Sequence, residues 1–247
     1  MEAEAAAAAA NTNTGNPYGL LALWQSGMIS KVTLCILVFM SLYSWFIIFT
    51  KLWDQRNMAK AASEVEKKFW TAPSIKDGVE RLRKGDDFRY IAEDGLRAAS
   101  HHEGRLTDRI DLHEWVTMAL QRATDAVNAN LATGLPFLAT VGSTAPFIGL
   151  FGTVMGILNA LIDIGMSGQP SIDRVAGPVG EALQMTAIGL VVAVPAVAGY
   201  NWLLARNKNL QSKVQSFASD LHAYMVSGAR VDTGVMTAPV AAKPVVK

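Results

Sequence analysis

Three long stretches without a charged side chain constrain the fold of this 247-residue chain more than any other feature. They cover residues 32–50, 126–162 and 182–205. Even the shortest, 19 residues long, spans roughly 28 Å as a helix, which is enough to cross the hydrocarbon core of a bilayer. A buried soluble helix of this length would normally carry a polar stripe. The sequence therefore predicts an all-α, polytopic membrane protein with three transmembrane helices, two of which extend into a charged helical domain.

Composition supports this class. The chain is 51% hydrophobic and only 17% charged, which is too apolar for an ordinary soluble domain. The formal net charge of +1 gives no electrostatic reason to expect nucleic acid as a partner, whereas membrane lipids are expected. The single cysteine, Cys35, lies in an apolar run, so an internal disulfide framework is excluded.

Turn residues, prolines and the ends of the apolar runs divide the chain into segments. We expect an N-terminal tail with an interfacial helix (1–30), transmembrane helix 1 (31–52), a helical domain (53–134), transmembrane helix 2 (135–164), a short loop (165–177), transmembrane helix 3 (178–205), and an amphipathic helix followed by a flexible tail (206–247). Pro146 is expected to kink the second of these spans.

The distribution of Lys and Arg predicts the orientation. Of the 22 Lys and Arg residues, 20 follow span one or span three, on one side of the membrane, and only Lys31 and Arg174 lie on the other. The positive-inside rule then places the helical domain and the C-terminus in the cytoplasm. The N-terminus and the loop 165–177 are expected on the outer side.

The cytoplasmic domain is expected to consist of short helices. Ser74 can cap one that runs to Lys84, a second is expected over 88–102, and a long one from residue 107. Its histidines raise the possibility of a metal site, with candidates His101, His102, Glu103 and His113. Their spacing matches no zinc motif, so a solvated helix end is the favoured interpretation, and no metal or other cofactor is expected.

The third span carries a single carboxylate, Glu181. A carboxylate in such a segment is costly to ionise and usually marks an ion or proton path. The alternative is a solvated carboxylate at the start of the helix, because Arg174 lies only seven residues earlier, roughly 10 Å along a helix.

Small residues form one face on each of the two later spans, and this pattern is typical of close helix packing in lipid. They are Gly142, Ala145, Gly149, Gly152 and Gly156 on the second span, and Ala182, Gly189, Ala193 and Ala196 on the third. Thr153 and Thr186 lie beside or within these faces and are candidates for a proton pathway. Two alternatives remain: the threonines can simply bond the carbonyl one turn back, and the glycines can serve packing alone.

Two motifs carry a family resemblance: GLFGTVMGI at 149–157, and EALQMTAIGL at 181–190, continuing through Pro195 to Asn201. They resemble the MotA/TolQ/ExbB proton-channel family. Met155 departs from the tryptophan that members often have there. The resemblance implies a homo-oligomeric ring, a pentamer, in a bacterial inner membrane. It also implies that the ring encloses the transmembrane helices of an ExbD-like dimer and works with a TonB-like protein.

Residue by residue, the resemblance matches the family's membrane carboxylate to Glu181 and its pore threonines to Thr153 and Thr186. The function it implies is that of a proton-channel and motor subunit that couples the proton motive force to TonB-dependent outer-membrane transport. A TolQ-like subunit of the Tol-Pal system and a non-conducting membrane scaffold are the alternatives. An enzyme is not expected, because no nucleophile–base pair, phosphate loop or metal cluster is evident.

Overall fold

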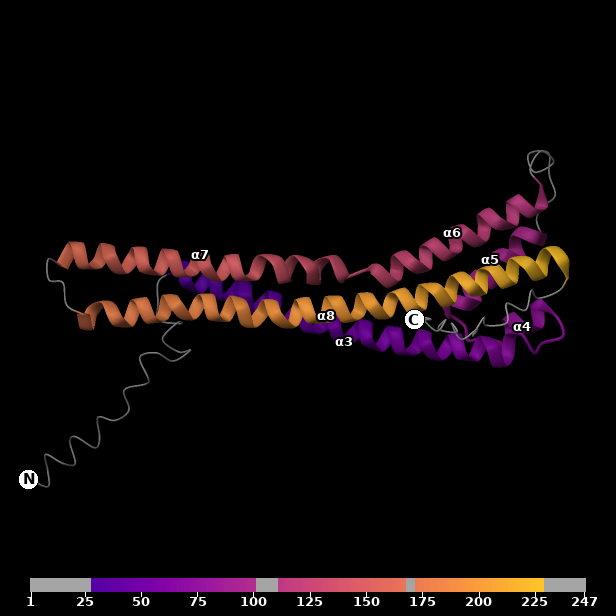
Figure 1. Cartoon of the computed structure of the whole chain (residues 1–247), viewed down its shortest axis with the longest axis horizontal. Coiled ribbons are helices and arrows are strands. Elements are labelled where there is room, and N and C mark those ends of the chain that lie inside the picture. Colours follow the sequence, from indigo (N-terminus) through magenta and orange to yellow (C-terminus); the bar gives the residue numbers. More distant parts are fainter. Residues whose placement is uncertain (1–27, 101–110, 168–171, 229–247) are drawn as a thin grey trace, which may run out of the picture. The chain divides into compact units, whose positions relative to one another are not determined.

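The computed structural model describes residues 28–100, 111–167 and 172–228. Within these ranges every regular element is helical, which confirms the predicted all-α class (Figure 1). The elements are α3 (Met28–Glu64), the π-helix η1 (Val65–Phe69), α4 (Ile75–Arg81), α5 (Asp87–Ser100), α6 (Leu112–Ala132), α7 (Leu135–Ser167) and α8 (Ile172–Ser227). Most of the tail and interfacial helix expected over 1–30 lies outside the described residues.

Three helical stretches are long and apolar enough to cross a membrane, as predicted. They are Met28–Phe69, Leu112–Met166 and Ala176–Ser227. The described residues fall into two compact units. Unit 1 holds the residues up to Gln55 and those from 132 to 207, and unit 2 holds 56–131 and the residues from Lys208 onward. Helices α3 and α8 each contribute to both units.

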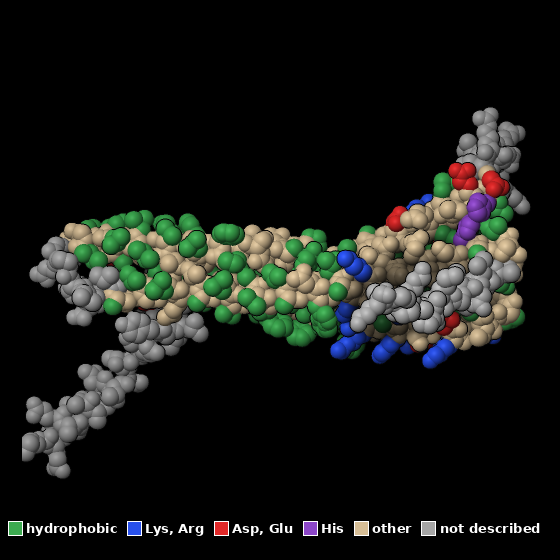
Figure 2. All heavy atoms as spheres, in the orientation of Figure 1, with side chains coloured by type: hydrophobic (Ala, Val, Ile, Leu, Met, Phe, Trp, Pro, Cys, Tyr) green, Lys and Arg blue, Asp and Glu red, His purple; other side chains and the backbone are tan. Residues whose placement is uncertain are grey.

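Unit 1 consists of α7 and parts of α3 and α8, and its outer surface is apolar. Two buried clusters join the three helices, one around Leu37, Val141 and Ala196 and one around Ile47, Leu138 and Leu203. On the face shown in Figure 2, hydrophobic side chains cover α7 and the neighbouring part of α8. A helix bundle that is apolar both inside and outside is typical of a membrane-spanning unit.

A buried amide contact joins α3 to α8 at one end of unit 1. Gln55 and Asn207 are 1% and 2% exposed, and Gln55 Nε2 donates to Asn207 Oδ1 at 2.6 Å and to the Leu203 carbonyl at 3.0 Å. Because buried polar groups are stable only when paired, this contact fixes which residues of the two helices face each other.

The helix boundaries differ in detail from those expected. Thr133 and Gly134 separate α6 from α7, and Gly134 has φ +85°, a conformation that glycine adopts at little cost. Pro146 lies inside α7 without ending the helix. The stretch 165–177, expected to be a loop, is helical over most of its length, because α7 reaches Ser167 and α8 begins at Ile172.

Unit 2 has its own apolar core, formed by α4, α5, α6, η1, the end of α3 and the last part of α8. Phe69, Phe88 and Phe217 meet at its centre, with ring centroids 5.2 and 5.4 Å from Phe217. Ser74 caps α4 as predicted, since its Oγ accepts a hydrogen bond from the Asp77 amide at 3.1 Å. The helix ends at Arg81, short of the expected Lys84.

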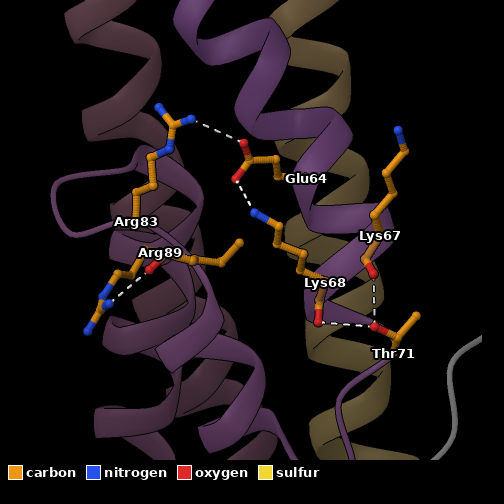
Figure 3. Close-up of polar contacts among 7 residues, drawn as sticks. Glu64, Lys67, Lys68, Thr71, Arg83 and Arg89 are labelled. Atoms are coloured by element: carbon orange, nitrogen blue, oxygen red, sulfur yellow. Dashed lines mark hydrogen bonds and ion pairs between the residues drawn. The ribbon is translucent and has the colours of Figure 1, made fainter.

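Ion pairs lie on the surface of unit 2 around η1 (Figure 3). Glu64 contacts Lys68 at 3.1 Å and Arg83 at 3.2 Å, and Thr71 Oγ1 donates to the Lys67 carbonyl at 2.9 Å. The hydrogen bond from Lys68, aided by the charges of Lys68 and Arg83, lowers the pKa of Glu64. Such surface pairs contribute little to stability, so the apolar core carries the fold of unit 2.

Candidate functional site

Two glycines bring the backbones of α7 and α8 into contact in unit 1. A Cβ atom on Gly149 would lie 2.6 Å from the Met185 carbonyl oxygen, and one on Gly189 would lie 2.7 Å from the Ala145 carbonyl oxygen. Neither position therefore has room for a side chain. The two helices cross at glycines, which carry only hydrogen in place of a side chain. Their backbones therefore approach each other as closely as small residues permit.

The other small residues extend this contact along both helices. A Cβ on Gly156 would meet that of Ala182 at 2.8 Å, and Gly152 lies against Met185 and against Thr33 of α3. Gly142 lies against Val197. Three of the small residues belong to the buried cluster shared with α3, namely Ala145, Ala193 and Ala196. The two small-residue faces thus pack against each other within a single chain.

The two candidate threonines meet at this crossing. Thr153 is 7% exposed, and its Oγ1 lies 2.9 Å from the Ala182 carbonyl oxygen and 3.2 Å from the Gly149 carbonyl oxygen. The Thr153 and Thr186 hydroxyls also share a hydrogen bond. Thr153 therefore bonds the Gly149 carbonyl one turn back on α7, as the alternative to a proton pathway predicted. It also bonds the Ala182 carbonyl and so links α7 to α8.

This arrangement gives one hydroxyl proton several possible acceptors. Thr153 has a single O–H and is surrounded by three oxygens, those of Gly149, Ala182 and Thr186. When Thr153 donates to Ala182, the Thr186 hydroxyl can donate to Thr153. When Thr153 donates to Thr186 instead, its proton no longer reaches the Ala182 or Gly149 carbonyl, so the two directions of donation differ in which oxygens they satisfy.

Glu181 directly precedes Ala182, whose carbonyl oxygen Thr153 approaches. Its side chain is half-buried, and among the described residues its carboxylate makes no hydrogen bond or ion pair. Thr186 lies on the same helix as Glu181, about 7.5 Å of helix rise further along α8, and Thr153 lies on the facing helix α7. Unit 1 thus holds a titratable group on α8 near a hydroxyl pair at the α7–α8 contact, and a carboxylate in an apolar segment usually marks an ion or proton path.

Metal ligation finds no support in the part of the chain that is described. No group of three or more His, Cys, Asp or Glu side chains lies close enough together there to hold a metal ion. His101, His102 and Glu103 fall outside that part, and His113 packs against His222 of α8, with ring centroids 4.6 Å apart. Sequence patterns missed this pairing because the two histidines lie on different helices, far apart in the chain.

Taken together, three apolar helices with a hydroxyl pair at the α7–α8 contact and a carboxylate on α8 define a polytopic helical membrane protein with a candidate ion path. The chain belongs to the MotA/TolQ/ExbB proton channel family, whose model matches residues 87–216. This confirms the resemblance seen in the two motifs. The family consists of membrane transport proteins, so the chain is a multi-pass membrane protein of that kind.

Individual relatives carry two names. The chain is 42% identical over 212 residues to "Biopolymer transport protein ExbB" of Xanthomonas campestris pv. campestris, covering 82% of this chain and 84% of the relative. It is 35% identical over 197 residues to the protein of the same name from Neisseria meningitidis, covering 78% and 90%. It is also 33% identical over 206 residues to "Tol-Pal system protein TolQ" of Pseudomonas aeruginosa, covering 81% and 89%.

Proposed function

We propose that the chain is a proton-channel and motor subunit of an ExbB-like complex in a bacterial inner membrane. The complex couples the proton motive force to TonB-dependent outer-membrane transport. The observation that carries this proposal is the hydroxyl pair of Thr153 and Thr186 at the α7–α8 contact, where Thr153 approaches the carbonyl of Ala182, the residue after Glu181. The names and identities of the ExbB relatives support the choice of system.

In this proposal Glu181 takes up and releases the proton, and the hydroxyl pair passes it along the α7–α8 contact. Each proton that crosses gains about 2.3 kcal/mol per 100 mV of membrane potential, so repeated transfers can drive mechanical work. The ring is a pentamer of this chain around an ExbD-like dimer, with a TonB-like protein as the partner that is moved. The N-terminus and 165–177 face the periplasm, and unit 2 and the C-terminus lie in the cytoplasm.

Proton flux tests this mechanism directly. The chain is reconstituted into liposomes with its ExbD-like partner, and acidification is followed under an imposed potential. Thr153→Val and Thr186→Val keep the side-chain shape and remove one hydroxyl. Each should slow the proton flux about five- to tenfold, because losing one hydrogen bond raises the activation free energy by roughly 1 kcal/mol. The double variant should be hardly slower than either single variant, because the two residues share one interaction.

Thr140→Val is the matched control. Thr140 is exposed on α7, and its Oγ1 donates to the Pro136 carbonyl at 2.9 Å. This variant should conduct like the wild type. Wild-type flux in both Thr153→Val and Thr186→Val would exclude the hydroxyl pair from the path, and no flux in the wild-type complex would favour a non-conducting scaffold.

A TolQ-like role is the second candidate, and the 33% identity to a TolQ over 81% of the chain favours it. The two roles differ in partner and phenotype. Expression in a strain lacking ExbB should restore growth on iron bound to a siderophore, and expression in a strain lacking TolQ should leave the detergent sensitivity of the envelope unchanged. The opposite pattern would assign the chain to the Tol-Pal system.

A further inference from the structure

An open cavity of about 170 Å³ lies between α6 and α8 within unit 2, and its lining is polar and apolar in similar measure. Most of its lining residues have uncharged side chains with groups that can form hydrogen bonds, and several of them are exposed. The lining consists of Thr117, Leu120, Gln121 and Thr124 from α6 and Gln215, Ala218, Ser219 and His222 from α8. A cavity of this volume holds several water molecules or a short piece of extended chain, since a water takes up about 30 Å³ in the liquid.

One wall of the cavity has unmet hydrogen-bonding capacity. Thr124 is 1% exposed, and its buried Oγ1 has no hydrogen-bond partner among the described residues. Buried polar groups are nearly always paired in folded proteins, so this oxygen, which lines the cavity, indicates that an occupant supplies its hydrogen bond.

The lining carries no charge at neutral pH. His222 is its one titratable residue, and burial, followed by the neighbouring His113, lowers the pKa of its ring below the ordinary value. Thr117 Oγ1 lies 3.0 Å from His222 Nε2 and donates to the His113 carbonyl at 2.7 Å. Because Thr117 gives its only proton to the His113 carbonyl, it accepts from His222 Nε2–H.

This chemistry selects the kind of occupant. Phosphates and lipid headgroups need cations, and the lining offers none. Amides and hydroxyls that both donate and accept match the alternating C=O and N–H groups of an extended peptide. At the exposed rim, Gln121 Nε2 already donates to Asp125 Oδ1 at 2.9 Å, so its Oε1 is the group that can accept, and the Gln215 amide can both donate and accept.

We propose that the occupant of the α6–α8 cavity is the chain's own C-terminal segment, residues 229–247, bound through its main-chain amides. The segment follows directly from the helix that forms one wall of the cavity. Gly228, at φ +71°, ends α8 with a hydrogen bond from its N–H to the Tyr224 carbonyl at 2.9 Å, the geometry that turns a chain away from a helix axis. Fully extended, 19 residues reach about 60 Å, whereas Gln215 lies only about 20 Å of helix rise before Gly228.

The composition of 229–247 fits a main-chain mode of binding. The segment consists largely of Ala, Val, Thr, Pro and Gly, with four charged residues at Arg230, Asp232, Lys243 and Lys247. Small side chains leave the peptide groups accessible, and proline favours an extended backbone. The bound segment would join α6 to α8 on the surface of unit 2.

A peptide-binding measurement tests the proposal. A fluorescein-labelled peptide of residues 229–247 is titrated with the full chain lacking only this segment, in detergent, and fluorescence anisotropy is recorded. Saturable binding is expected, with much weaker binding of the same peptide when its main-chain amides are N-methylated, and with much weaker binding to the complete chain because its cavity is already filled. No binding to the shortened chain would overturn the proposal.

Two variants of the shortened chain locate the binding site. Thr124→Val keeps the shape and removes the unpartnered hydroxyl, and Gln215→Ala removes one amide. Each should weaken peptide binding about five- to tenfold, the value of one hydrogen bond. Thr124→Val should not lower thermal stability, because it removes an unpaired polar atom. Ser216→Ala, on the adjacent exposed position outside the cavity, is the control that should bind normally. Unchanged affinity in both cavity variants would place the peptide elsewhere.

Disulfide trapping in the complete chain separates the chain's own segment from other occupants. In a Cys35→Ser background, Ser219→Cys is combined with cysteines at Thr233, Thr237 or Ala241. A crosslink within one chain is expected from at least one pair, and none when Ser216→Cys replaces Ser219→Cys. Crosslinked dimers instead of crosslinked monomers would show that a second copy supplies the segment. That result, or an absence of crosslinks, would overturn the assignment.

Discussion

At the scale of single residues, Glu181 decides between a conducting subunit and a scaffold. Glu181→Gln keeps the size and the hydrogen-bonding groups of the side chain but cannot release a proton. We expect the variant to assemble normally and to reduce proton flux to the rate of liposomes without the complex. Uptake of a siderophore-bound iron by cells that carry the variant should stop as well.

Glu181→Asp provides the comparison. It moves the acid by about one methylene and keeps it titratable, so partial flux is expected, because proton transfer across a water-filled gap tolerates small changes in position. Uptake at wild-type rates in Glu181→Gln, with normal protein levels, would remove Glu181 from the mechanism and favour the scaffold.

Other residues at this scale show what a sequence pattern can and cannot predict. Thr153 and Thr186 were expected beside the small-residue faces because helical periodicity alone gives the face of each position. Their shared hydrogen bond depends on how α7 and α8 are shifted along each other. That shift is set by the clash-free crossing of Gly149 and Gly189, which one-dimensional patterns do not encode.

At the scale of elements, the α7–α8 crossing depends on the absence of side chains at two positions. Gly149→Ala and Gly189→Ala each place a Cβ within 2.7 Å of a backbone oxygen of the facing helix. We expect each to destabilise unit 1 by about 1–3 kcal/mol through overpacking. The measurement is thermal unfolding in detergent, together with the proton flux of the reconstituted complex.

Gly165→Ala is the control for this prediction. It lies in the same helix α7, but a Cβ there meets nothing within 4 Å. Alanine also favours a helix over glycine by up to about 1 kcal/mol, so this variant should be as stable as the wild type or more so. Equal melting temperatures for all three variants would mean that the crossing yields to an added methyl group.

A second element-scale prediction concerns the turn between α4 and α5. Asp86 is half-buried there, and its Oδ1 accepts a hydrogen bond from the Phe88 amide at 3.2 Å. Burial, the largest influence, raises the pKa of Asp86 above the ordinary value. A raised pKa means that folding favours the protonated acid. The contribution of this group to stability is therefore fully present below its unfolded pKa and is lost as the pH rises through its folded pKa.

Asp86→Asn should therefore stabilise unit 2 slightly at pH 7, since the amide oxygen still accepts from Phe88 and no buried charge remains. The difference from the wild type should shrink as the pH falls towards 4 and below. Unfolding curves at several pH values, followed by tryptophan fluorescence, measure this. Asp77→Asn, at an exposed position in the first turn of α4, serves as a comparison. A constant difference across the pH range would contradict the assignment to Asp86.

At the scale of the whole molecule, the class and the number of membrane helices followed from the sequence because hydrophobic runs are long-range signals that need no partner. The residues at which those helices begin and end could not be predicted from the sequence. The break at Gly134 needs a left-handed backbone conformation that few signals in the sequence specify. The helical turns within 165–177 extend α7 and α8 through Gly165 and Gly177, residue types that disfavour a helix. The pairing of His113 with His222 joins two helices and required the fold itself.

The orientation of the molecule in the membrane is a prediction from charge alone. Of the 22 Lys and Arg residues, only Lys31 and Arg174 lie on the side assigned to the periplasm. Single cysteines at Ser74 and Ser171 in a Cys35→Ser background test this in intact spheroplasts with a membrane-impermeant maleimide. The reagent should label the cysteine at Ser171 and spare that at Ser74 until the membrane is opened, because a biased distribution of Lys and Arg in short segments sets topology during insertion.

Ser74 caps α4 at an exposed position, so its lack of labelling would reflect the membrane barrier and not burial. Labelling at Ser74 alone would reverse the orientation and would put unit 2 on the periplasmic side.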